Sequence, residues 1–200
     1  MPAEPLEPPC GVVLAAGAGR RFGGPKALAR TPAGTPWVAL AVRALRAAGC
    51  GEILVALGAA ADEAAPLVPP AATIVRVPDW ASGVAAAVRA SLAVAASGPA
   101  SAAVIMPVDT PDADPAAIAR LVRRAQPDAL AQAVYDGVPG HPVLIGRAHW
   151  EAVSAAVRGD IGARPYLIAQ NADLVECGDL WSGADRDERW SRSDHGRKEF

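Results

Sequence analysis

The chain has 200 residues, a formal net charge of −2 and a sequence isoelectric point near 5.9, so it suits one domain with a sizeable core and gives no electrostatic reason to expect a nucleic-acid partner. No apolar stretch approaches the roughly 20 residues that cross a bilayer, and the acidic, proline-rich start lacks a signal-peptide pattern. Three widely spaced cysteines without a C-x-x-C pair argue against a disulfide framework or a structural zinc site, and we expect a soluble cytoplasmic protein.

Apolar segments of strand length alternate with alanine-rich segments of helical length. Strands are predicted at 10–16, 52–58, 73–77, 102–108, 129–135 and 142–146, and helices at 36–49, 60–66, 82–96, 114–125, 147–157 and 163–169. Ser82 is placed to cap the third helix, and Asp114 before a proline to begin the fourth. We expect one domain over 10–190, between a flexible N-terminus (1–9) and a polar tail (191–200).

This alternation predicts an α/β fold of the Rossmann-like type, a three-layer sandwich with a mostly parallel central sheet and helices on both faces. The segment 102–108, AAVIMPV, is apolar on both faces, as expected of a buried parallel strand. Ligands of such sheets bind beyond the carboxyl ends of the strands. That rule selects the loops 16–26, 79–83 and 107–112 as candidate site loops.

The first strand ends in a loop with four glycines, two arginines and a lysine, GAGRRFGGPK. A dinucleotide fingerprint fails here because Phe22 takes the place of its third glycine, and a P-loop fails because Pro25 interrupts it and no hydroxyl follows Lys26. Glycine N–H groups still approach phosphate oxygens closely, and Arg20, Arg21 and Lys26 carry charge to neutralise a polyphosphate. A glycine-rich turn with solvated arginines is the structural alternative.

The stretch LAAGAGRRFGGPKAL (14–28) resembles the L-A-A-G-x-G-x-R-[MF]-G-x-x-K signature of nucleotidyltransferases with the MobA-like, nucleotide-diphospho-sugar transferase-like fold. The resemblance implies that the strand end and the turn hold a nucleotide, while an arginine and the lysine contact its triphosphate. The residues given these roles are Leu14, Ala15, Ala16, Gly17 and Gly19 for the nucleotide, and Arg20 and Lys26 for the phosphates.

Asp109, in PVDTP (107–111), emerges at the carboxyl end of the apolar strand 102–108. Mg²⁺ prefers one or two carboxylates together with phosphate oxygens, so a carboxylate facing a triphosphate suits a metal site. A plain turn cap is the alternative on position alone. The MobA-like family carries a metal aspartate in a matching segment, which implies that role for Asp109.

A second metal ligand is expected near the C-terminus, where the family shows D-[IV]-D-T-P-x-D. Asp185-Arg186-Asp187 supplies the D-x-D, but Glu188-Arg189 stands where Thr-Pro is expected. Asp187 is the expected ligand and Asp179 the fallback. A surface charge run is the alternative.

The segment VPDWASGVAAAVRASL (77–92) resembles the family pattern N-P-D-[YW]-x-x-G-x-x-x-S-[VL], with Val77 and Ala87 departing from it. The resemblance implies that Ser82 and Gly83 contact the nucleobase. Trp80 as a hydrophobic anchor for the loop is the alternative.

Two later segments, GVPGHPVLIGRAHW (137–150) and RGDIGARPYL (158–167), resemble elements of the molybdenum cofactor cytidylyltransferases, the MocA branch of the family. In that branch they lie on the side of the pterin substrate, which makes His141 and Arg164 candidate substrate contacts. A plain turn at Gly-His-Pro and a helix start at 162–164 are the structural alternatives.

The resemblance covers about residues 10–190 and implies Mg²⁺-dependent nucleotidyl transfer, in which a substrate phosphate attacks the α-phosphorus of a nucleoside triphosphate and pyrophosphate leaves. Arg20, Lys26 and Asp109 are then the catalytic residues, acting by positioning and charge neutralisation. Ala16, where the guanylyl branch has glycine, and the PGHP segment favour CTP over GTP. The expected acceptor is a molybdopterin-type substrate, with a molybdenum hydroxylase as recipient of the product.

Other functions remain open at this point. One is a guanylyltransferase or another transferase of this fold acting on a phosphosugar or methylerythritol phosphate. A second is a non-catalytic carrier of the molybdenum cofactor, favoured by the irregular 185–189 segment. The third, a dinucleotide-dependent oxidoreductase, is disfavoured by the failed fingerprint and by the lack of an acidic residue at the end of strand 52–58.

Overall fold

The computed structural model describes residues 7–187. The predicted polar tail, most of the predicted flexible N-terminus and the Glu188-Arg189 departure lie outside the described residues. Within the described range no helix has both the length and the apolar character needed to span a membrane.

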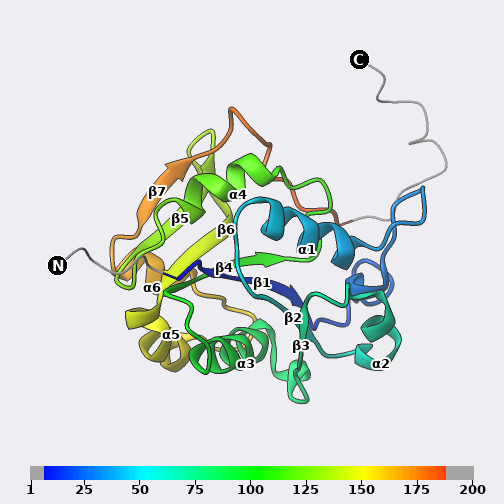
Figure 1. Cartoon of the computed structure of the whole chain (residues 1–200). Coiled ribbons are helices and arrows are strands. Elements are labelled where there is room, and N and C mark those ends of the chain that lie inside the picture. The colour runs from blue at the N-terminus through cyan, green and yellow to red at the C-terminus, as the bar shows by residue number, and fades with distance from the viewer. Residues whose placement is uncertain (1–6, 188–200) are drawn as a thin grey trace.

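A seven-stranded sheet in the order β3-β2-β1-β4-β6-β5-β7 forms the centre of the fold (Figure 1). Its strands are β1 (Cys10–Ala15), β2 (Ile53–Leu57), β3 (Thr73–Arg76), β4 (Ala102–Pro107), β5 (Leu130–Tyr135), β6 (Val138–Gly146) and β7 (Asp173–Glu176). Strand β6 is antiparallel to both of its neighbours, and every other neighbouring pair is parallel. The prediction of a mostly parallel sheet is confirmed.

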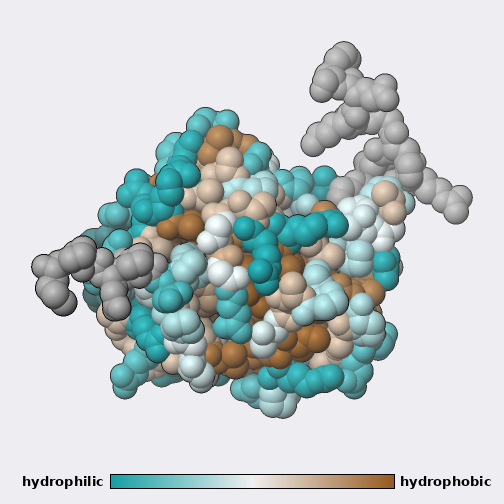
Figure 2. All heavy atoms as spheres, viewed as in Figure 1, coloured by the Kyte–Doolittle hydropathy of each residue, from teal (hydrophilic) through white to brown (hydrophobic). Residues whose placement is uncertain are grey.

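Helices cover both faces of the sheet, which confirms the three-layer arrangement (Figure 1). One face carries α1 (Trp37–Ala47) and α4 (Pro115–Val122), and the other carries α3 (Val84–Ala96), α5 (Trp150–Ala156) and α6 (Arg164–Ala169). The short helix α2 (Ala61–Ala64) follows β2, and 3-10 turns lie at η1 (Lys26–Leu28), η2 (Ala65–Leu67), η3 (Trp80–Ser82) and η4 (Arg147–His149). On the face seen in Figure 2, hydrophobic residues gather along α3, whose sequence is rich in alanine and valine.

The two predicted helix caps have different outcomes. Asp114 caps α4 as predicted, because its carboxylate accepts the Ala116 N–H at 2.7 Å. The prediction for Ser82 is wrong: Ser82 belongs to η3, and Gly83 is the N-cap of α3 without a side-chain cap. The amide of Ala85, which a serine cap would satisfy, instead donates to the Gly159 carbonyl at 3.0 Å.

The β5–β6 hairpin and strand β7 are the parts of the sheet that differ most from expectation. Strand β6 begins at Val138, whereas the sequence predicted a start at 142. The prediction began late because β6 includes two prolines, which argue against a strand when read from sequence. The two-residue turn Asp136-Gly137 has φ of 51° and 78°, the backbone that reverses a chain tightly, and it forces β6 to run antiparallel to β5. Strand β7 was not predicted at all, since its four residues carry little apolar pattern.

The carboxylate of Glu176, the last residue of β7, joins this hairpin turn to the chain that follows β7. Its oxygens accept N–H hydrogen bonds from Gly178 at 2.8 Å, from Cys177 at 3.1 Å, and from Asp136 and Gly137 at 3.2 Å each. These donors, Gly178 foremost, hold the pKa of Glu176 below its ordinary value, although desolvation acts in the opposite direction. The ionised carboxylate therefore stabilises the folded state.

Replacing Glu176 with glutamine should lower the melting temperature at about pH 7 and much less at about pH 3. Because the folded pKa is depressed, the stabilisation is complete above the ordinary glutamate value of 4.5 and is lost as the pH falls through the folded value. Thermal denaturation across this range measures the difference. Glu151→Gln, at an exposed position on α5, controls for the loss of one charge. An equal difference at both pH values would contradict the interpretation.

Candidate active site

The loop between β1 and η1 folds back on itself and keeps its glycines for two different reasons. Gly19 has a φ of +58°, and a Cβ there would collide with the carbonyl oxygen of Gly24. The N–H of Gly24 donates to the carbonyl oxygen of Gly19 at 3.0 Å. Gly17 is exposed, and no atom lies within 4 Å of the position where its Cβ would be. Gly19 therefore closes the turn, and Gly17 leaves open backbone for a ligand.

Phe22 explains why the loop departs from the dinucleotide fingerprint. Its ring is buried and packs on Trp37 with the ring centroids 5.3 Å apart. The loop is therefore anchored into the core under α1 at the position where the fingerprint has its third glycine. The same ring lies 5.6 Å from the ammonium of Lys26, a cation–π distance.

Lys26, the first residue of η1, is held between two carboxylates from distant parts of the chain. Its Nζ donates to Asp109 Oδ2 at 2.8 Å and to Asp187 Oδ1 at 2.9 Å. The side chains of Lys26 and Asp109 are only 15% and 17% exposed, whereas that of Asp187 is 61% exposed. The site thus concentrates one ammonium and two carboxylates where the glycine loop meets the end of β4.

The electrostatics of this contact favour the charged forms. Desolvation lowers the pKa of Lys26, but the hydrogen bonds and charges of Asp109 and Asp187 together outweigh it and raise that pKa above its ordinary value. The pKa of Asp187 is lowered, first by its hydrogen bond with Lys26 and then by the charges of Lys26 and Arg21. The Lys26–Asp187 ion pair therefore persists at neutral pH.

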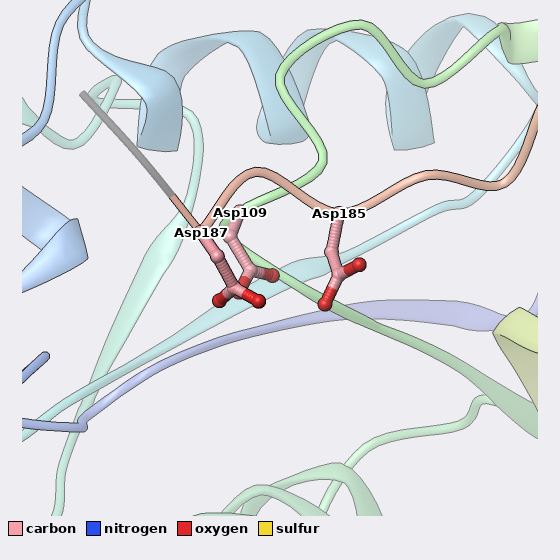
Figure 3. A group of neighbouring side chains, drawn as sticks. All are labelled: Asp109, Asp185 and Asp187. Carbon is pink, nitrogen blue, oxygen red and sulfur yellow. The ribbon is translucent and has the colours of Figure 1, made fainter. Parts of the chain in front are cut away.

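Asp185 joins Asp109 and Asp187, and carboxylate oxygens of the three residues lie within 4.8 Å of one another. In Figure 3 the three side chains converge, Asp109 from the loop after β4 and the other two from the C-terminal segment. The Oδ1 atom of Asp109 is buried without a hydrogen-bond partner among the described residues. Clustered oxygen donors with an unused buried lone pair fit a hard divalent cation such as Mg²⁺ or Mn²⁺.

The C-terminal strap, residues 177–187, brings the last two carboxylates to the site. The Arg186 N–H donates to the Asp109 carbonyl at 2.8 Å, which fixes the backbone between Asp185 and Asp187 against the β4 loop. Asp179 lies earlier in the strap and is paired with Arg120 of α4 at 2.6 and 2.8 Å. The structure therefore places the expected ligand Asp187 beside Asp109 and the fallback Asp179 in a different ion pair.

Of the two arginines in the glycine loop, Arg21 is the one whose charge acts on Asp187. Both side chains are exposed, but it is the charge of Arg21 that lowers the pKa of Asp187. Counting from Gly19, the arginine of the family signature also falls on Arg21. The phosphate role of Arg20 stays a prediction, and the signature position makes Arg21 a second candidate for it.

A pocket of about 410 Å³ opens at the carboxyl ends of β2 and β3. It is lined by residues 57–63 and 76–78 together with Trp80. Ala16 borders it, since the Ala59 N–H donates to the Ala16 carbonyl at 2.9 Å. Trp80 also packs on the apolar cluster beneath the pocket, so the anchoring alternative for this residue holds along with its place in the wall.

His141 lies within β6, so the alternative of a plain turn at Gly-His-Pro is wrong. Its carbonyl accepts a hydrogen bond from the Tyr135 hydroxyl at 2.6 Å. The side chain keeps exposed surface, yet surrounding protein atoms desolvate the ring and lower its pKa, while the charges of Asp109 and Asp185 act to raise it. The ring is therefore uncharged at neutral pH and lies within electrostatic reach of the carboxylates.

Arg164 is the exposed first residue of α6, which confirms the helix start read at 162–164. The segment before it lies against the loop that precedes α3. Gly83 has a φ of +105°, and a Cβ there would collide with the Gly159 carbonyl. Ser82 is exposed beside this contact. Among the described contacts, none joins Arg164 to the carboxylate group.

Comparison with known proteins agrees with this geometry. Residues 11–174 match the family described as the MobA-like NTP transferase domain. The chain is 34% identical over 194 residues to the nicotine blue oxidoreductase of Paenarthrobacter nicotinovorans, covering 90% of this chain and 93% of that relative.

Solved structures share the fold. The Rv0371c protein of Mycobacterium tuberculosis is similar with a TM-score of 0.74 and 26% identity, over 86% of this chain and 88% of that one. The same protein has a solved structure in complex with manganese, with a TM-score of 0.70 and 23% identity over the same shares of the two chains. A nucleotidyl transferase from Methanothermobacter reaches a TM-score of 0.76 at 18% identity, over 90% and 92% of the two chains.

Proposed function

The chain belongs to the MobA-like NTP transferase domain family, whose members use a nucleoside triphosphate as substrate, and from that membership we propose that it transfers CMP from CTP to a molybdopterin-type acceptor with release of pyrophosphate. The observation that carries the proposal is the contact of Lys26 with Asp109 and Asp187 at the end of the glycine loop. It joins a phosphate-binding cation to a group of carboxylates that suits a divalent metal.

The pocket and the carboxylates lie at opposite ends of the same loop, which supports an orientation for the nucleotide. Ala16 borders the pocket, and Lys26 contacts the carboxylates. The base and ribose would occupy the pocket, and the triphosphate would follow the open backbone at Gly17 toward Lys26. Backbone N–H groups along this path would bind the phosphate oxygens.

The proposed reaction requires little covalent chemistry from the protein. Asp109 and Asp187, with Asp185 beside them, would hold Mg²⁺, and the bound ion would neutralise charge on the α-phosphate and on the departing pyrophosphate. Lys26 would exchange its carboxylate partners for phosphate oxygens. The acceptor phosphate is mostly a dianion near pH 7 and would attack without a side-chain base. Catalysis would then consist of positioning and charge neutralisation.

The choice of CTP and of a pterin acceptor rests on sequence features. Ala16, at the border of the pocket, replaces the glycine of the guanylyl branch. His141 lies within electrostatic reach of Asp109 and Asp185, where an acceptor phosphate would approach the α-phosphorus. Arg164 is exposed at the start of α6 and would bind the acceptor from the other side of the α3 loop.

A second candidate function is supported by one specific observation. The relative with 34% identity over nearly the whole chain is named an oxidoreductase. A dinucleotide-dependent redox reaction in the same cleft is therefore the competing proposal, with the pocket and the glycine loop holding a nicotinamide dinucleotide. Phe22 in place of the third fingerprint glycine speaks against it.

One set of assays separates these functions. Protein incubated with Mg²⁺, molybdopterin and either CTP or GTP should release pyrophosphate with CTP and form a cytosine dinucleotide. Parallel incubation with NADH or NADPH and a dye acceptor should leave the nicotinamide absorbance unchanged. Pyrophosphate release with GTP alone would overturn the choice of base, and nicotinamide oxidation without pyrophosphate release would favour the oxidoreductase.

A further inference from the structure

Tyr135 and Trp181 form an aromatic contact that joins the β5–β6 hairpin to the C-terminal strap. Tyr135 is the last residue of β5, and Trp181 is in the C-terminal strap. Their rings meet edge to face, with centroids 5.3 Å apart and planes at 84°, and both residues are buried. An edge-to-face arrangement of buried rings is one of the favoured geometries of aromatic pairs, so this contact holds the strap against the sheet.

This contact holds the middle of the strap, residues 181–184, whereas the end of the strap is held by the bond from the Arg186 N–H to the Asp109 carbonyl and by the Lys26–Asp187 ion pair. The first half of the strap is held by the Arg120–Asp179 ion pair and by the Cys177 N–H, which donates to the Val134 carbonyl at 2.8 Å. The chain then runs without regular secondary structure to Asp185. Within the stretch 181–184 Trp181 is the buried side chain.

Gly183 extends the same contact. It has a φ of +70°, and a Cβ there would collide with the Tyr135 ring. The strap backbone therefore lies directly against the tyrosine ring, two residues before Asp185. The size of the ring sets the distance between the strap and the sheet, and hence the backbone position from which the Asp185 side chain extends.

Tyr135 also contacts the acceptor side through its hydroxyl. The O–H donates to the His141 carbonyl at 2.6 Å across the hairpin. Burial raises the pKa of this hydroxyl, which therefore keeps its proton and remains a donor at all physiological pH values. One side chain thus holds the main chain of His141 with its polar end and the strap with its ring.

We infer that Tyr135 and Trp181 are positioning residues, which set Asp185 and Asp187 opposite Asp109 and keep His141 in register with them. The inference rests on the proposed function, since it concerns how the same site is held. Neither residue belongs to the carboxylate group or lines the pocket. Residues that orient metal ligands in this way typically change metal affinity about 10- to 100-fold when replaced.

Direct titration with Mn²⁺, followed by the electron paramagnetic resonance of the free ion, tests the inference without any need for turnover. Trp181→Leu should raise the Kd for Mn²⁺ by about tenfold or more. Trp181→Phe should keep it within about twofold of the wild type, because phenylalanine retains an edge-to-face ring and removes an indole N–H that has no partner among the described residues.

Trp150→Leu is the matched control for the loss of a buried indole. Trp150 is buried in the opposite layer, where its Nε1–H donates to the Ile145 carbonyl at 2.9 Å. The control should lower the melting temperature at least as much as Trp181→Leu and leave the Kd for Mn²⁺ unchanged. This comparison separates positioning from general destabilisation.

The tyrosine hydroxyl is tested separately. Tyr135→Phe should keep Mn²⁺ affinity and raise the KM for the acceptor, since only the hydrogen bond to the His141 carbonyl is lost. Tyr166→Phe, which removes a hydroxyl held by His149 at 2.9 Å, is the matched control and should change neither quantity.

Two failures are distinguishable. If the wild type binds Mn²⁺ no better than Asp109→Asn, the metal centre of the proposed function is refuted, and the inference falls with it. If the wild type binds Mn²⁺ and folded Trp181→Leu matches it within about twofold, the metal centre stands and the positioning role is overturned.

Discussion

Asp109→Asn should reduce the rate of nucleotidyl transfer by about 10³-fold or more while leaving the fold intact. The substitution keeps the shape of the side chain and removes the charge of the most buried of the three clustered carboxylates. Lys26 keeps its bond to Asp187 at 2.9 Å, so the melting temperature should change little. Pyrophosphate release under saturating Mg²⁺ and CTP measures the rate, and circular dichroism checks the fold.

Asp112→Asn provides the control for this experiment. Asp112 lies in the same loop after β4, and its carboxylate is 3.8 Å from the Arg186 guanidinium. Removing that charge should affect turnover by less than about tenfold, because Asp112 is outside the carboxylate group. Retained activity in folded Asp109→Asn would remove Asp109 from the reaction.

Lys26→Gln should change metal binding and turnover in opposite directions. In the wild type the ammonium bonds Asp109 Oδ2 and Asp187 Oδ1, so it occupies oxygens of two of the carboxylates that would hold a divalent cation. Removing it eliminates a competing cation and the repulsion between two positive charges, so the Kd for Mn²⁺ should fall several-fold. Turnover should fall by about 10²- to 10³-fold, because the cation that stabilises the transferring phosphate is lost.

Metal titration and pyrophosphate release on the same preparations give both quantities for Lys26→Gln. Arg30→Gln is the control for the loss of a positive charge near the loop, since the Arg30 guanidinium bonds only the Gly34 carbonyl among its described contacts, at 2.7 Å. A parallel loss of metal affinity and turnover in Lys26→Gln would show that the lysine organises the carboxylates rather than competing for them.

Much of the site follows from local sequence because the relevant residues come directly after strands. Asp109 follows an apolar run, and the glycine loop follows another, so both reach the same edge of a parallel sheet. The spacing from Gly17 to Lys26 belongs to one continuous loop, which makes it legible without knowledge of the fold. These features predicted the architecture, which the structure confirms, and placed the glycine loop and Asp109 at one edge of the sheet, while the phosphate-binding role of the loop stays a prediction.

Other residues were assigned incompletely because their roles depend on neighbours. Arg20 and Arg21 are adjacent, and only their directions in space decide which charge acts on Asp187. Serine is a common helix cap, but the Ala85 amide that Ser82 would bind donates instead to the Gly159 carbonyl, from a segment far along the chain. Local propensity is overridden wherever a distant group satisfies the same hydrogen bond.

By itself, then, the sequence determined an alternating α/β chain with a glycine loop and an aspartate at the carboxyl edge of its sheet, because periodicity and turn residues report the burial and direction of each segment. Only the tertiary structure decided that β6 runs antiparallel, that the strap crosses to Asp109, and that Lys26 meets Asp187, 161 positions away. Pairings of that kind depend on which buried surfaces and backbone groups come together in the folded chain. The short polar segment 185–187 has no hydrophobic periodicity that would place it, and its association with Asp109 was expected only from the D-x-D of the family that the chain resembles.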